Sequence, residues 1–194
     1  DTIEQIQEAG YLITYEQMNT LIEFQRKWAQ LSMWTRALMV SILEDISNKT
    51  AIVNHLFTIL SELYYIFRVF YGPIISQQLL NLLSRLVTNQ WSLFEAMKSG
   101  EKEAINQSTV NIYKNADELA ELLSKINVYW YEDQWKNLLY QYIKLLIDEM
   151  VAMLSRNHER EIEIYNQLQY IAEIMGGYMA RGIIARSSGA SAQE

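Results

Sequence analysis

The chain has 194 residues, half of them apolar, with a formal net charge of -7, one Pro, seven Gly and no Cys. This length fits one domain around a single hydrophobic core, and the lack of Cys excludes disulfides, thiolate catalysis and Cys-ligated zinc. Nucleic-acid binding needs clustered cations, whereas this acidic chain spreads its sixteen Lys and Arg along its whole length, so we expect no nucleic-acid partner.

The first predicted helix begins at Tyr15. From there to Ile42 apolar residues recur at steps of three and four, which predicts an amphipathic helix of about thirty residues. Cap-forming side chains at residues 47–50 start a second helix, which Gly72 ends. Pro73 suits the first turn of a third helix, so a sharp corner should join the two.

The third helix should end at Gly100, and the fourth should run from about Ile105 to Ile126. A fifth helix begins near Trp135, and its pattern contains a polar patch at residues 155–161. We interpret this patch as the solvated middle of one long helix, the alternative being a short connection between two helices.

The predicted fold is therefore all-α, an up-down helical bundle of five to six helices with a long C-terminal helix. The bundle should span residues 15–185. An acidic N-terminal arm, residues 1–14, precedes it, and a tail of linker composition, residues 186–194, follows it, either flexible or held by a partner.

No membrane span is predicted. The most apolar run, residues 63–71, contains Arg68 and stops at Gly72, well short of the ~20 residues that a membrane helix needs. Because the chain begins with Asp1 instead of Met, we expect that a leader or tag has been removed, which slightly favours an extracellular or cell-surface location.

Neither His lies in a metal-binding pattern. Helical bundles bind metals through Glu-x-x-His pairs, but Ile52 stands three residues before His55 and Ser155 three before His158. The sequence also lacks a Gly-rich phosphate loop and a nucleophile motif. We therefore expect no metal, no cofactor, no catalytic residue and no enzymatic activity.

One carboxylate is predicted to face the core. Glu149 falls seven residues after Tyr142, on a stripe that otherwise carries Leu and Met. A buried carboxylate needs a polar partner, and Arg36, Asn89 or Asn115 could supply it. Such a polar layer more often fixes helix register than performs chemistry.

Aromatic residues are unusually frequent, with thirteen Tyr and five Trp. The second helix carries them on more than one face: Tyr64, Tyr65, Phe67, Phe70 and Tyr71. A helix that is apolar all round must be covered on every side. The cover is either a wrapping segment, such as the N-terminal arm, or another subunit, and we predict an interface between copies.

Several short motifs resemble one family. They are Trp-Ala-Gln at 28–30, Trp-Thr-Arg at 34–36, Phe-Tyr-Gly at 70–72, Tyr-Lys-Asn-Ala-Asp-Glu-Leu-Ala at 113–120 and Ile-Asn-Val-Tyr-Trp at 126–130. The pattern is similar to uncharacterised small helical-bundle proteins of spore-forming bacteria, sometimes mislabelled acetylglutamate kinase. The resemblance covers residues 28–184. It implies histidines at three positions where this chain has Leu31, Leu86 and Tyr142, so a ligand function implied by the resemblance should be absent here.

Two functions remain open at this stage. The first is a non-enzymatic structural protein that self-associates into a homo-oligomer or filament. Residues 1–25 carry a charge of -5, from five acidic side chains and no basic one, while Arg181 and Arg186 make the last helix basic, and unlike ends favour head-to-tail contacts. The alternative is a bundle that binds a metal or small ligand, which rests on the implied histidine layer and on Glu149.

Overall fold

The structure is a computed structural model that describes residues 13–191, with side chains described through residue 189. Within that range it is an all-α bundle of five helices and contains no strand, as the sequence predicts. The helices are α2 (Tyr15–Leu43), α3 (Lys49–Ser99), α4 (Lys102–Ile126), α5 (Glu132–Leu154) and α6 (His158–Ser191). None of them is long and apolar enough to cross a membrane.

Local signals set most of the helix boundaries. Thr14 caps α2 through a reciprocal pair of bonds, since its hydroxyl accepts from the Gln17 amide at 3.1 Å and the Gln17 side chain accepts from the Thr14 amide at 3.0 Å. Gly100 ends α3 with φ 75°, a left-handed conformation that Gly adopts without a steric penalty. These boundaries agree with the sequence prediction.

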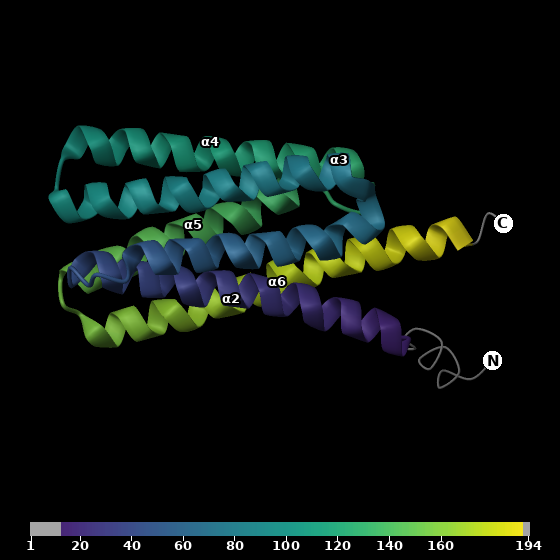
Figure 1. The fold of residues 1–194 in the computed structure, drawn as a ribbon, viewed down its shortest axis with the longest axis horizontal. Helices are drawn as coiled ribbons and strands as arrows, with labels where there is room; N and C mark the ends of the chain where they lie inside the picture. Colours follow the sequence, from purple (N-terminus) through teal and green to yellow (C-terminus); the bar gives the residue numbers. More distant parts are fainter. Residues whose placement is uncertain (1–12, 192–194) are drawn as a thin grey trace.

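The predicted corner lies inside α3. Gly72 has φ 75° and ψ 175°, and Pro73 follows at the first position of the next helical segment. The segment before the corner packs on α2, where Lys27 pairs with Glu62. The segment after it packs on α4, where Arg85 pairs with Glu118. The five helices therefore form six antiparallel segments (Figure 1).

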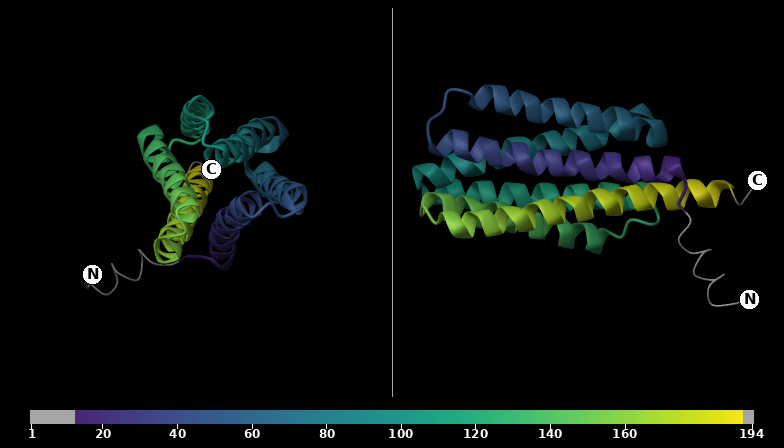
Figure 2. Two further views of the ribbon diagram at one scale, coloured as in Figure 1. Left: turned by 90° about the vertical axis from the view of Figure 1, so that its left-hand side faces the viewer. Right: turned by 90° about the horizontal axis from the view of Figure 1, so that it is seen from below.

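These segments pack in a closed order around one core. α2 contacts α6 and α3, α4 contacts α3 and α5, and α5 contacts α6. Figure 2 (left) shows this order along the bundle axis. The buried side chains come from all five helices and from the α4–α5 loop, which contributes Trp130.

The interpretation of residues 155–161 as the middle of one helix is wrong. α5 ends at Leu154 and α6 begins at His158, because Arg156 has φ 56° and interrupts the helical hydrogen bonds. The Asn157 amide donates to the Ala152 carbonyl at 2.9 Å, which closes the end of α5. Asn157 then caps α6 by accepting from the Arg160 amide at 3.1 Å.

The C-terminal part also differs from the prediction. Linker composition after residue 185 predicts a tail, but α6 continues to Ser191. In this segment the Ser187 and Ser188 hydroxyls donate to the carbonyls of Ile183 and Ile184, four residues earlier, a side-chain bond that a helical backbone accommodates. Residues 1–12 of the expected arm and 192–194 of the expected tail lie outside the described residues.

The start of α2 and the end of α6 lie at one end of the bundle, which we call the corner end. It comprises the Gly72 corner, the α4–α5 loop, the start of α2 and the end of α6 (Figure 1). Two bonds connect these parts: Arg186 donates to the Phe70 carbonyl at 3.3 Å, and Asn127 donates to the Tyr71 hydroxyl at 2.8 Å. Among the described residues, Glu16 at the start of α2 and Arg186 near the end of α6 therefore lie at the same end of the bundle.

Close approach of α6 to α2 depends on a glycine. A Cβ atom added to Gly176 would lie 2.6 Å from the Gln25 Cα and 2.6 Å from the Phe24 carbonyl oxygen, and a backbone cannot move aside cheaply. The neighbouring Gly177 would meet only the side-chain ends of Arg181 and Gln25, at 3.0 and 3.2 Å. Only the first of the two glycines is therefore required for this contact.

We predict that Gly176→Ala lowers the free energy of unfolding by about 2–3 kcal/mol, because the overpacked site must push α6 away from α2. Gly177→Ala is the matched control and should be neutral or stabilise the protein by up to ~1 kcal/mol through helix propensity. Urea denaturation of both variants measures the difference. Equal effects would contradict the assigned backbone contact.

Candidate functional site

The most unusual polar group in the described part of the chain is a cluster of three charged side chains from three helices. Glu149 of α5 lies 3.5 Å from Arg36 of α2, measured from Oε1 to Nε. Glu161 of α6 accepts hydrogen bonds from the Arg36 guanidinium at 2.7 Å. We call Arg36, Glu149 and Glu161 the carboxylate cluster.

Two of the three residues were found from the sequence, and Glu161 was not. Glu149 is fully buried, as its position on the Leu and Met stripe predicts. Glu161 is 6 % exposed and begins the buried stripe of α6, with Ile164 and Leu168 next along it. This spacing of three and four residues predicts that Glu161 is buried, but the interpretation of residues 155–161 as a solvated patch left Glu161 out of the stripe.

The cluster contains two carboxylates and one guanidinium. Burial raises the pKa of Glu149 to about 8; Arg36 opposes this rise, while the negative charge of the nearby Glu161 adds to it. Both oxygens of Glu149 are buried and have no hydrogen-bond partner. A carboxylic acid is therefore the form of Glu149 that suits this site at neutral pH.

Further polar groups adjoin the cluster. The Arg36 guanidinium lies over the Tyr165 ring, 5.0 Å from its centroid, which is a cation-π contact. Deeper in the core, the Thr35 hydroxyl lies 3.4 Å from Gln90 Oε1. Burial raises the pKa of the Tyr142 hydroxyl, so this group stays neutral.

A small internal cavity lies beside Thr35, Gln90 and Tyr142. Its volume is about 10 Å³, the size of one water molecule. Leu31 and Leu86 also line it, so the three positions at which the resemblance implies histidines come together in space. With Leu, Leu and Tyr at these positions, the cavity has no imidazole ligand and no room for an organic molecule.

Asn89 and Asn115 do not join the carboxylate cluster. Asn115 donates to the Leu82 carbonyl at 3.1 Å and Asn89 approaches the Asn111 carbonyl at 3.5 Å, so both connect α3 with α4. Within residues 13–189, no three His, Asp or Glu side chains gather in a way that could hold a metal ion.

The predicted aromatic interface divides into buried and exposed residues. Phe67 and Tyr71 belong to the core, where their rings stack at 4.4 Å and adjoin Trp130. Tyr65 is 63 % exposed, whereas Tyr64 and Phe70 are half-buried, and Arg181 and Arg186 are exposed. Arg186 covers the outer face of the Tyr71 ring at 4.6 Å from its centroid.

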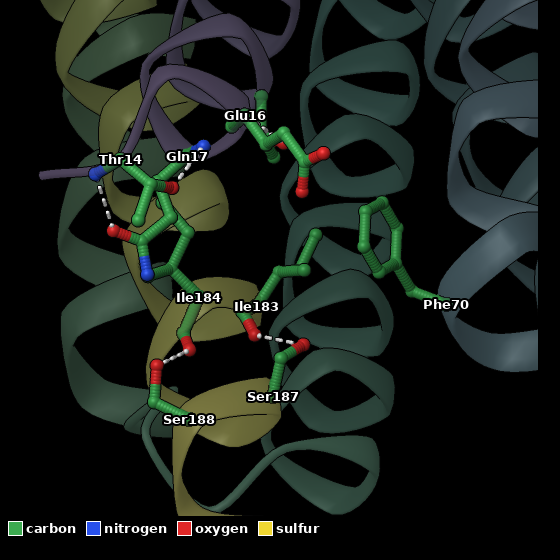
Figure 3. Close-up of a pocket in the computed structure, with 9 residues that line it drawn as sticks. Thr14, Glu16, Gln17, Phe70, Ile183, Ile184, Ser187 and Ser188 are labelled. Carbon is green, nitrogen blue, oxygen red and sulfur yellow. Dashed lines mark hydrogen bonds between the residues drawn. The ribbon is translucent and has the colours of Figure 1, made fainter. Parts of the chain in front are cut away.

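A groove crosses the corner end between α2, α3 and α6. It has a volume of about 340 Å³, and its walls include Thr14, Phe70, Ile183 and Ser187. Figure 3 shows that Thr14 and Gln17 bond to each other and that Ser187 and Ser188 bond within α6. These polar groups serve the helices themselves, so the groove offers a partly apolar surface instead of a set of converging ligands.

Comparison of the chain with protein-family models, with curated proteins and with solved structures gave no match. The cluster, the cavity and the corner end are therefore interpreted from their own geometry.

We predict that Arg36→Met lowers the free energy of unfolding by about 2–3 kcal/mol at neutral pH, because it leaves Glu161 without a cation in a buried site. The loss should shrink at acidic pH, where the carboxyl groups are protonated. Arg26→Met is the control, since Arg26 pairs with Glu23 on the surface of the same helix and such pairs contribute little. Equal losses in the two variants, measured by urea denaturation, would contradict this account.

Proposed function

We propose that this chain is a non-enzymatic structural protein that associates with a second copy of itself through the corner end of its bundle. The observation that carries the proposal is the uneven distribution of exposed apolar side chains. Eight large apolar residues of the described range are more than 60 % exposed, and six belong to the corner end or lie near it: Tyr15, Tyr65, Val69, Ile74, Val128 and Tyr131. Concentrated apolar exposure of this kind is typical of an interaction surface.

The charge distribution supports a copy of the same chain as the partner. Residues 63–94, which form the corner and the segments on either side of it, contain Arg68 and Arg85 and no acidic residue. Their charge is +2, so the rest of the chain carries -9 to give the total of -7. Two copies repel each other over most of their surfaces, and the repulsion is weakest where two corners meet.

The shape of the corner supports a two-fold contact. A hollow of about 410 Å³ lies beside the corner, lined by Tyr64, Pro73, Ile74, Gln77, Gln78 and Asn81. Ile74 is 77 % exposed and Val69 is 79 % exposed. The same patch therefore has a hollow and, beside it, apolar side chains that fit the hollow of a second copy. A patch that complements itself favours an isologous dimer, in which each copy uses the same residues, over an open filament.

We do not propose the alternative of a ligand- or metal-binding bundle. The internal cavity has space for one water molecule, and Arg36 already neutralises one carboxylate of the carboxylate cluster. No observation in the described part of the chain favours an organic ligand over self-association.

We predict that the purified chain is a dimer in light scattering coupled to size exclusion, and that Val69→Glu combined with Ile74→Glu makes it a monomer. The two introduced carboxylates would face each other across the contact and lose their hydration there. The matched control is Val110→Glu combined with Val151→Glu, at positions of α4 and α5 that are 61 % and 52 % exposed. It should leave the dimer intact.

A strictly monomeric wild-type chain at high micromolar concentration would contradict the proposal. Equal dissociation of both double variants would contradict the assignment of the contact to the corner. Cosedimentation of a monomeric chain with lipid vesicles would assign the same apolar surface to a membrane interface instead.

A further inference from the structure

The carboxylate cluster has one negative charge too many when both of its acids are ionised. Arg36 is the one cation in contact with it in the described structure, and this guanidinium bonds to Glu161 at 2.7 Å while lying 3.5 Å from Glu149. The other groups that face the cluster, Tyr142 of α5 and Tyr165 of α6, are phenols and bring no positive charge. The site therefore requires one more positive charge, and a proton is the smallest ligand that supplies it.

Helix positions decide which carboxyl group holds this proton. Glu161 lies in the first turn of α6, where the helix dipole favours a negative charge. Glu149 lies outside the first turn of α5, so its ionised form has no such support. Because Glu161 also takes the shorter bonds from Arg36, it is the ionised partner and Glu149 is the acid.

We propose that one proton, bound by Glu149 beside the Arg36–Glu161 pair, holds the α5–α6 hairpin on α2, and that loss of this proton loosens the hairpin near its turn. The three side chains come from the three helices concerned, so a second buried negative charge acts directly on their packing. The Arg156 turn provides the place where the hairpin opens, because its backbone already departs from the helix at φ 56°. This pH-dependent packing of the hairpin is independent of the self-association through the corner end.

The direction of the pH effect follows from the two states of Glu149. Its pKa is about 8 in the folded chain, against an ordinary value of 4.5, so between these values the folded state holds a proton that the unfolded state has lost. The stabilisation is complete below about pH 4.5, falls as pH rises, and is lost as pH passes through about 8. In that interval the unfolding equilibrium constant should rise by up to about tenfold per pH unit.

The test compares thermal and urea unfolding of the wild-type chain and of Glu149→Gln between about pH 5 and about pH 9, an interval that spans both states of the carboxyl group. The Gln amide of the variant imitates the neutral acid. The stability of the variant should therefore not fall as pH rises, and at the alkaline end it should exceed the stability of the wild type. Glu161→Gln removes the like charge and should move the fall to lower pH. Asp148→Asn is the control, since Asp148 pairs with Lys144 on the surface of α5, and it should keep the wild-type profile.

Two measurements on the wild-type chain keep the proposal testable if a variant fails to fold. The side-chain carboxyl of Glu149, followed by carbon NMR, should titrate well above the ordinary range. Amide hydrogen exchange around the α5–α6 turn should increase at alkaline pH by more than that around the α3–α4 turn. An ordinary titration of Glu149, identical profiles for wild type and Glu149→Gln, or stoichiometric binding of added Mn²⁺ or Zn²⁺ that removes the pH dependence would each overturn the proposal.

Discussion

The contact between α2 and α6 is the constraint on which the rest of the bundle depends. These two helices are far apart in the sequence and have the most extensive packing of any pair, and Gly176 lets their backbones approach without a side chain between them. Gly182, further along α6, provides the space for the Trp130 indole. This indole fixes the α4–α5 loop by donating to the Tyr178 carbonyl at 3.2 Å, 48 residues later in the sequence, so the path of α6 sets the position of this loop.

The same contact explains why a charged cluster survives in the core. Once α2 and α6 are close, Arg36 and Glu161 face each other, and their pairing stabilises the start of α6 beside the Arg156 turn. Glu149 then lies next to a pair that is already neutral, and its own ionisation has no cation left to compensate it. The high pKa of Glu149 is thus a consequence of helix packing, with burial as the largest cause.

The sequence predicts those features that a few neighbouring residues determine. Thr14, Gly72 and Gly100 act through their own backbones and caps, so the helix boundaries that they set are correct. The break at Arg156 could not be predicted in this way, because Arg seldom adopts a positive φ and part of its support comes from an ion pair with Glu44, in the distant α2–α3 turn. The burial of Phe67 and Tyr71 has a similar origin, since the ring that adjoins them, Trp130, belongs to a loop that follows α4. Self-association is not tested by this fold and stays a proposal.

The carboxylate cluster and the corner end lie at opposite ends of α6. α6 begins beside the carboxylate cluster and ends at the corner end, where Arg186 packs on Tyr71. Between them, Gly176 lets the backbones of α6 and α2 approach closely within this extensive helix pairing. Close packing of this kind resists sliding, since sliding would drive flanking side chains into the α2 backbone. Polar bonds then hold α6 at both ends: the carboxylate cluster connects its start to α2, and the bond from Arg186 to the Phe70 carbonyl connects its end to α3.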